Sequence, residues 1–424
     1  MKRSLPLVGV IEGFYGRPWT TGQRGRLFAQ MAGWGMNTYL YAPKDDLWHR
    51  VHWREPYPFR VQEELAQVLA AARSDGVRFV YALAPGLDLV WNDPSDRQAL
   101  IRKVSSLQSL GVSDFALLFD DIPAQQDRAA QAMEQVEAAH LVLRHLRQGS
   151  SEGLLLFCPT EYCGVLAQPS VRGSPYLRTL GERLDPAIEV FWTGPQIVSP
   201  EIDLASVREV AGVLGRRPLL WDNLHASDYT SHRLHLGPYG GRPLALREEV
   251  SGILSNPNTP YEVNVPGLAS LAEYAVAQEG WTPEASGLRV LAAWSLAFGP
   301  SGVDPGDLAL LADTLYLPHR LGPRAEALLA AARRLADQPE DPAARTEVGA
   351  GQERFQRVLR ALEAGPNRDL LYDLHPFLND GLEELSRLLA LNGRAAPGRY
   401  PYRGGLGDRL LALGWSADTE GRGA

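Results

Sequence analysis

The chain has 424 residues, of which 45% are hydrophobic and 22% charged, a composition typical of globular proteins. Its formal net charge of -8, with no long basic run, argues against nucleic acid as a partner, and no window approaches the roughly 18 apolar residues of a membrane span. Its two cysteines, Cys158 and Cys163, are too few for a secreted disulfide framework, so we predict a cytoplasmic protein with reduced thiols.

Short apolar segments recur through the first two thirds of the chain, each ending in polar residues or in Gly and Pro. The eight segments are Leu5–Phe14, Met36–Asp45, Val77–Gly86, Val112–Asp121, Gly153–Tyr162, Ala187–Pro195, Arg217–Asn223 and Val250–Pro257. Runs of Val, Ile, Leu and Phe without polar alternation are typical of strands buried on both faces of a parallel sheet. Amphipathic segments separate them, so we predict a (β/α)8 TIM barrel over residues 1–280.

The seventh connection, residues 225–249, is the least regular and predicts a long loop with little helix. An open doubly wound sheet is the structural alternative to a barrel. Its first turn often carries G-x-G-x-x-G, whereas the glycines of GVIEGFYGRPW are spaced differently. A dinucleotide-binding interpretation is therefore weak.

After about residue 280 the strand pattern stops, and we predict an α-helical domain over residues 281–424 with a flexible tail. Five segments rich in Ala, Leu and Arg carry this prediction: residues 285–299, 305–317, 323–338, 346–365 and 374–393. The helices either support the barrel or offer a surface for self-association, and a homodimer through them is one expectation.

Catalytic residues of such barrels lie at the carboxyl ends of the strands and in the loops that follow. The sequence places acids, amides, aromatic residues and a lysine there: Glu12, Gly13, Lys44, Asp45, Asp46, Asp120, Asp121, Glu161, Tyr162, Trp192, Thr193, Trp221, Asp222, Asn223, Asp228 and Asn256. Aromatic faces and bidentate hydrogen-bonding groups around a cleft suit a sugar. His232 and His235 lack acids in a ligand pattern, so we predict neither a metal site nor a cofactor.

Asp120 and Asp121 directly follow the fourth predicted strand, in the stretch ALLFDDIP. Glycosidic cleavage normally uses one protonated and one ionised carboxyl group, and repulsion between neighbouring aspartates favours keeping a proton on one of them. Consecutive strand residues point to opposite sides, however, so adjacent aspartates do not easily flank one bond. A sugar whose 2-acetamido carbonyl attacks C1 removes this difficulty. The residues alone leave open a catalytic pair or a solvated strand end.

Several stretches together resemble glycoside hydrolase family 84, in collinear order over about residues 5–280. They are GVIEGFYGRPW, NTYLYAPKDDLWHRVHWRE, FALLFDDI, LFCPTEYCG, SPYLRTLGE, IEVFWTGP, WDNLHASDY, LGPYGGR and LSNPN. The likeness is greatest to the eukaryotic members, which remove β-linked N-acetylglucosamine (GlcNAc) from serine and threonine. The C-terminal helices resemble the family's helical domain only in class.

This resemblance implies a retaining β-N-acetylglucosaminidase that forms an oxazoline intermediate and needs no metal or organic cofactor. Asp120 would orient the acetamido group, and Asp121 would be the general acid and then the base for the water that opens the oxazoline. Tyr162 would bind the acetamido oxygen, and Trp221 would form an aromatic wall. The other matching residues would contact the sugar hydroxyls or the acetamide: Gly13, Lys44, Asn223, Asp228 and Asn256.

Two other functions stay open at this point. A β-N-acetylhexosaminidase acting on cell-wall or glycosaminoglycan fragments would use the same chemistry on another substrate. A noncatalytic GlcNAc-binding barrel is the alternative of another class, and the Asp120–Asp121 pair counts against it because a lectin needs no general acid. In each case the expected partner is a β-linked GlcNAc conjugate: a glycoprotein, a glycopeptide or an oligosaccharide.

Overall fold

The computed structural model describes residues 5–148, 153–229, 233–299 and 302–390, together with residues 406, 409 and 410. The predicted flexible tail and His232 lie outside these residues. By internal contacts the chain divides into two compact units. A barrel unit comprises Met1–Ala226, Gly240–Thr259 and Ala272–Ala277, and a helical unit comprises Ser227–Tyr239, Pro260–Leu271 and Gln278–Ala424.

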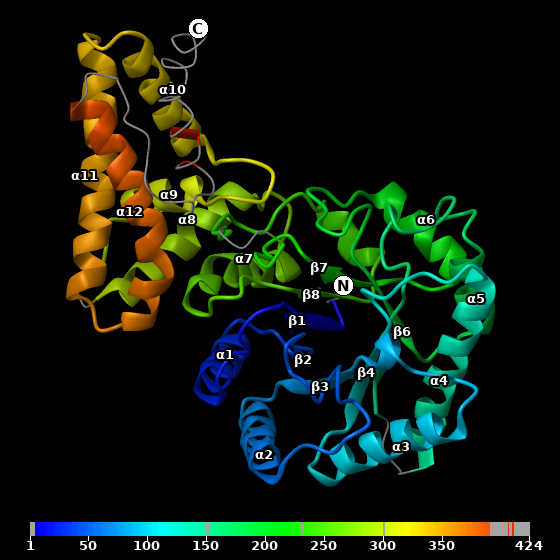
Figure 1. The fold of residues 1–424 in the computed structure, drawn as a ribbon. Helices are drawn as coiled ribbons and strands as arrows, with labels where there is room; N and C mark the ends of the chain where they lie inside the picture. Colours follow the sequence, from blue (N-terminus) through cyan, green and yellow to red (C-terminus); the bar gives the residue numbers. More distant parts are fainter. Residues whose placement is uncertain are drawn as a thin grey trace, which may run out of the picture. The chain divides into compact units, whose positions relative to one another are not determined.

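Eight parallel strands close into a barrel in the first unit, with each strand paired to the next and β8 paired to β1 (Figure 1). The strands are β1 (Leu7–Glu12), β2 (Thr38–Tyr41), β3 (Arg78–Leu83), β4 (Asp114–Leu118), β5 (Leu155–Cys158), β6 (Glu189–Trp192), β7 (Leu219–Asp222) and β8 (Gly252–Ser255). Each lies within one of the predicted apolar segments. The predicted TIM barrel is therefore confirmed.

Helices follow the first six strands and lie outside them (Figure 1). They are α1 (Thr21–Gly33), α2 (Phe59–Ser74), α3 (Pro94–Ser109), α4 (Arg128–Gln148), α5 (Pro175–Arg183) and α6 (Leu204–Leu214). Thr20 and Gln23 form a capping box at the start of α1, and Gly215 ends α6 with a φ of 65°. Between β7 and β8 the described chain has only the 3-10 helix η2 (Leu244–Glu248), as the sequence predicts.

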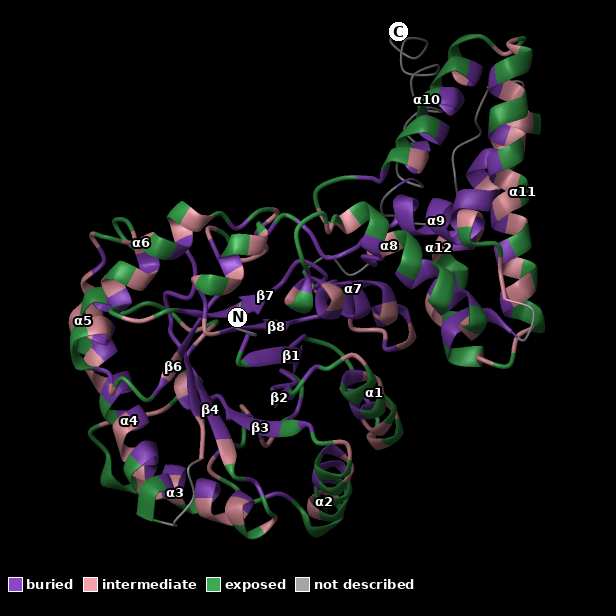
Figure 2. Cartoon of the chain, turned by 180° about the vertical axis from the view of Figure 1, so that it is seen from behind, coloured by how far each residue is buried: buried purple, intermediate pink, exposed green. Residues whose placement is uncertain are grey.

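The strands are buried almost throughout, which explains why their sequences show continuous apolar runs (Figure 2). Small and branched side chains fill one core cluster of the barrel, among them Ile11, Leu40, Val80, Ala116 and Leu156. Tyr162 and Trp221 belong to the same cluster. Side chains at the carboxyl ends of the strands are therefore held by the packed core rather than by loops alone.

The helical unit is built on a leucine-rich core. Its helices include α8 (Pro283–Trp294), α9 (Pro305–Thr314), α10 (Pro323–Asp337), α11 (Pro342–Ala364) and α12 (Arg368–Ala390); α7 (Val265–Val276) and the 3-10 helix η3 (Glu262–Asn264) precede them in the chain. The helix α12 begins earlier than its apolar pattern indicates and contains Pro376. Leu406 and Leu410 are buried in the same core. No described helix is long and apolar enough to cross a membrane.

Candidate active site

The two aspartates after β4 lie beyond the end of the strand, so their side chains need not point to opposite sides as consecutive strand residues do. The strand ends at Leu118, and the backbone N–H of Phe119 makes a last hydrogen bond to the Cys158 carbonyl, at 2.9 Å. Asp121 then turns into the left-handed region with a φ of 55°, where no other non-glycine residue of the described chain lies. This turn lets Asp120 and Asp121 approach one cation together instead of pointing to opposite sides.

That cation is Lys44, which follows β2. Its Nζ donates a short hydrogen bond to Asp120 Oδ2 and lies 3.8 Å from Asp121 Oδ2. Burial disfavours the ammonium, but attraction to Asp120 and Asp121 outweighs it, so the pKa of Lys44 is raised above its ordinary value. The lysine stays charged at neutral pH and offsets the repulsion between the two carboxylates.

The two carboxylates differ in exposure and in partners. The side chain of Asp120 is 9% exposed, and its Oδ1 is a buried acceptor without a hydrogen-bond partner. The side chain of Asp121 is 33% exposed and accepts hydrogen bonds from Tyr15, at 2.9 Å, and from Tyr162, at 3.1 Å. Asp120 is therefore a buried acceptor with one oxygen available, whereas solvent reaches Asp121.

Tyr15 was not among the predicted site residues, although it lies inside the stretch GVIEGFYGRPW. Its hydroxyl also accepts a hydrogen bond from Arg50, at 3.1 Å, and burial together with the Asp121 charge raises its pKa. The tyrosine therefore remains a hydrogen-bond donor to Asp121. Nothing in the local sequence ties Tyr15 to Asp121, because the contact joins the loops after β1 and β4.

Amides and an indole form the other part of the site. The Gly13 N–H donates to Asn256 Oδ1 at 3.3 Å, Asn256 Nδ2 donates to Asn223 Oδ1 at 3.0 Å, and the same oxygen accepts from Trp221 Nε1 at 3.0 Å. The indole of Trp221 also faces the ammonium of Lys44, 5.9 Å from the ring centroid. The structure thus joins Gly13, Trp221, Asn223 and Asn256 to the lysine and its carboxylates.

Close packing requires glycine at position 13. A Cβ there would lie 2.5 Å from the indole of Trp221 and 2.7 Å from Ile11, and real Cβ atoms do not approach other atoms this closely. The backbone of Gly13 is therefore pressed against the aromatic wall, next to the amides.

Other acids at the strand ends are structural. Glu12 is fully buried against Arg24, and Asp222 is fully buried against Arg242. Glu161, beside Tyr162, accepts hydrogen bonds from Ser174 at 2.5 Å and Arg128 at 3.0 Å, and burial raises its pKa. These pairs hold the ends of the strands in place. Trp192 is likewise a buried core residue, at 1% exposure.

Asp228 is the one predicted site residue that belongs to the helical unit, and it is half-buried there. Its role at the barrel mouth stays a prediction. Within the described residues, no three His, Cys, Asp or Glu side chains come together in a way that could hold a metal ion. Cys158 and Cys163 are buried free thiols, and burial raises the pKa of both.

A closed parallel barrel with paired carboxylates, a lysine, amides and an aromatic wall at the carboxyl ends of its strands defines the glycoside hydrolase class of site. The sequence model of the beta-N-acetylglucosaminidase family matches residues 8–296. The chain belongs to this family, and its resemblance to glycoside hydrolase family 84 is confirmed.

Two curated relatives are similar to the barrel region. Protein O-GlcNAcase of Rattus norvegicus is 46% identical over 274 residues, which are 63% of this chain and 30% of the relative. The Mus musculus protein of the same name is 45% identical over 274 residues, which are again 63% of this chain and 30% of the relative. The chain therefore spans less than a third of the length of these relatives.

Solved structures extend the similarity to most of the chain. A mutant of the Thermobaculum terrenum O-GlcNAc hydrolase matches with a TM-score of 0.80 and 28% identity, over 91% of this chain and 83% of that one. CpGH84B matches with a TM-score of 0.78 and 27% identity, over 92% of this chain and 68% of that one. These matches cover the helical C-terminal region as well as the barrel.

Proposed function

We propose that this chain is a retaining β-N-acetylglucosaminidase that removes O-linked GlcNAc by substrate-assisted catalysis. One observation carries the proposal: Asp120 presents a buried oxygen without a partner, while its other oxygen and Asp121 share the ammonium of Lys44. A buried acceptor is costly unless a ligand satisfies it, and the N–H of a 2-acetamido group is a suitable donor.

The reaction needs no nucleophile from the protein. Asp120 Oδ1 accepts the acetamide N–H and orients the carbonyl oxygen toward C1, which that oxygen attacks as the bond to the leaving group breaks. Asp121 gives its proton to the leaving oxygen, and the amide becomes an oxazoline as its N–H proton passes to Asp120. Asp121 then takes a proton from water, and the hydroxide adds to C1 as the bond between C1 and the oxazoline oxygen breaks. Asp120 returns the proton to the nitrogen, and GlcNAc leaves with its configuration retained.

The different exposures of the two aspartates support this division of roles. A group that only orients the amide benefits from burial, because its hydrogen bond strengthens where water is excluded. The general acid must meet the leaving group first and water afterwards, and Asp121 is the more exposed of the two. The hydroxyl of Tyr15 holds Asp121 in reach of both.

The other site residues would bind the sugar. In the proposal Tyr162 binds the acetamido oxygen, Trp221 forms the wall of the acetamide pocket, and the hydroxyl and acetamide contacts come from Gly13, Lys44, Asn223, Asp228 and Asn256. The series of hydrogen bonds that links Gly13 to Trp221 supports this, since it fixes the side-chain amides in place before a ligand binds.

The identity of the glycoconjugate is part of the proposal. We propose a GlcNAc-modified protein or peptide, because the barrel region is 46% and 45% identical to two proteins named Protein O-GlcNAcase. A faster rate on a GlcNAc-modified peptide than on chitobiose would support it, and the reverse would favour a hexosaminidase of oligosaccharides. A homodimer through the C-terminal helices and a cytoplasmic location remain predictions, which sedimentation and cell fractionation would test.

Hydrolysis of nitrophenyl β-GlcNAc and of a GlcNAc-modified peptide tests the mechanism. Asp121→Asn should lose about a hundredfold or more on the peptide and less on nitrophenyl β-GlcNAc, whose leaving group needs no proton. Asp120→Asn should lose activity on both, and a thiazoline mimic of the oxazoline should inhibit the unaltered chain. Asp337→Asn, at an exposed end of α10, is the control. Full activity of both site variants on the peptide would refute the mechanism.

A further inference from the structure

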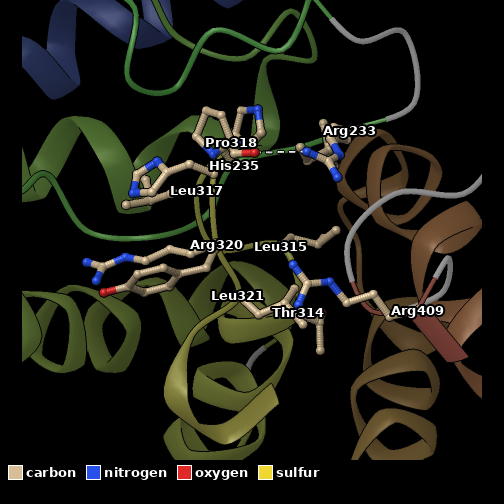
Figure 3. A pocket seen from close by; sticks show the side chains of 12 residues that line it. Arg233, His235, Thr314, Leu315, Leu317, Pro318, Arg320, Leu321 and Arg409 are labelled. Atoms are coloured by element: carbon tan, nitrogen blue, oxygen red, sulfur yellow. Dashed lines mark hydrogen bonds between the residues drawn. The ribbon is translucent and has the colours of Figure 1, made fainter. Parts of the chain in front are cut away.

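A pocket lies within the helical unit, apart from the barrel residues assigned to the sugar. Its volume is about 90 Å³, and twelve residues from three stretches of chain line it, including Arg233, His235, His319, Arg320 and Arg409 (Figure 3). Among the described residues that line it, none is an aspartate or a glutamate. In a chain with a net charge of -8, three arginines around one small pocket call for an explanation.

The arginines of this pocket have few carboxylate partners. Neither Arg233 nor Arg320 forms an ion pair within the described part of the chain; Arg233 donates to the Pro318 carbonyl at 2.9 Å, and Arg320 stacks over the Tyr316 ring at 5.4 Å. Arg409 meets Glu326 at 3.3 Å, with both side chains nearly half exposed. An exposed pair of this kind contributes at most about 1 kcal/mol, so a bound anion can replace it.

Figure 3 shows the guanidinium groups of Arg233 and Arg409 on the same side of the pocket, although the two residues are far apart in the sequence. The hydrogen bond to Pro318 uses one nitrogen of Arg233 and holds the group in place, which leaves its other N–H donors available. A planar guanidinium binds phosphate and sulfate through two parallel hydrogen bonds, so two such groups suit one tetrahedral oxyanion.

We propose that this pocket binds one tetrahedral oxyanion, a phosphate or sulfate group, between Arg233 and Arg409. The volume supports this size of ligand, because 90 Å³ equals roughly three waters at about 30 Å³ each and is too small for a nucleotide. Arg320, which also lines the pocket, adds positive potential. The inference is independent of the glycosidase chemistry.

The bound anion would also link the C-terminal residues to the rest of the helical unit. Leu406 and Leu410 are buried in the apolar core, and Arg409 lies between them in sequence and lines the pocket. An anion that bridges Arg409 and Arg233 therefore joins residues far apart in the sequence. Binding should accordingly raise the melting temperature of the chain.

Calorimetric titration of inorganic phosphate into the full chain, at an ionic strength held constant with chloride, tests the proposal. We expect saturable binding of one anion per chain, which Arg233→Gln and Arg409→Gln each weaken by about tenfold or more. Arg409→Lys should bind phosphate with intermediate affinity, since lysine keeps the positive charge but lacks the planar guanidinium that forms two parallel hydrogen bonds. Arg60→Gln is the matched control, because Arg60 forms an exposed pair with Glu64 at the same 3.3 Å.

Two further measurements make the outcome decisive. Retained glycosidase activity of the Gln variants shows that they fold, since neither arginine belongs to the catalytic site. Glucose 6-phosphate serves as a second probe: tighter binding than inorganic phosphate identifies a phosphorylated small molecule as the ligand, and weaker binding identifies the free anion. Non-saturable heats, or equal phosphate affinity in the unaltered chain and both Gln variants, would overturn the proposal.

Discussion

Replacing Lys44 by methionine removes the only cation that both Asp120 and Asp121 contact among the described residues. The attraction between Lys44 Nζ and Asp121 Oδ2 at 3.8 Å is about 4 kcal/mol at an effective dielectric constant of about 20. Asp120 loses a still closer partner, and breaking a buried pair in this way typically costs about 3–5 kcal/mol. Without Lys44, the repulsion between the two carboxylates is no longer offset, so the side chains are no longer held together in one site.

The assay is kcat/KM for nitrophenyl β-GlcNAc. Because Asp120 and Asp121 lose the cation that they share, we expect kcat/KM for Lys44→Met to fall by about two orders of magnitude or more. Lys103→Met is the matched control: Lys103 is also buried, but it donates to the Glu55 carbonyl, at 2.6 Å, away from the aspartates. The reasoning fails if Lys44→Met keeps the same kcat/KM as Lys103→Met.

Two other predictions concern stability and packing. Burial, opposed by the Glu262 N–H, raises the pKa of Asp373 from 3.8 to about 7, so the folded chain loses stability as pH rises between these values. Asp373→Asn should therefore raise the free energy of unfolding of the helical unit by up to about 4 kcal/mol at pH 8 and by little at pH 4, as measured by urea titration. Gly13→Ala should lower kcat/KM at least about tenfold, because its Cβ would clash with Trp221 at 2.5 Å; an unchanged value would contradict the described wall.

The sequence predicts the barrel because each strand is buried on both faces and therefore appears as an uninterrupted apolar run. The segment Val112–Asp121, for example, contains β4 and also marks the aspartates at its carboxyl end. The loop between β7 and β8 was also predictable, since its many Gly, Pro and His residues show no helical period. Local pattern is enough for these features, because strand burial and helix amphipathicity are local in origin.

Other features depend on contacts between distant residues and left no local signal. The left-handed turn at Asp121 falls on a residue that is not glycine, so no rule of composition predicts it. The place of Lys44 between the carboxylates and the contact of Tyr15 with Asp121 follow from closure of the barrel. The helix α12 begins before Pro376 because packing of its leucines outweighs the hydrogen bond that proline removes.

The most direct test of the central claim is the rate of hydrolysis of nitrophenyl glycosides whose N-acetyl group carries none, one, two or three fluorines. Fluorine withdraws electrons from the amide carbonyl and weakens it as a nucleophile. If the acetamido group held by Asp120 attacks C1, kcat/KM should fall steeply with each added fluorine. A rate that is independent of fluorine content would contradict the account, because the nucleophile would then belong to the protein or to water.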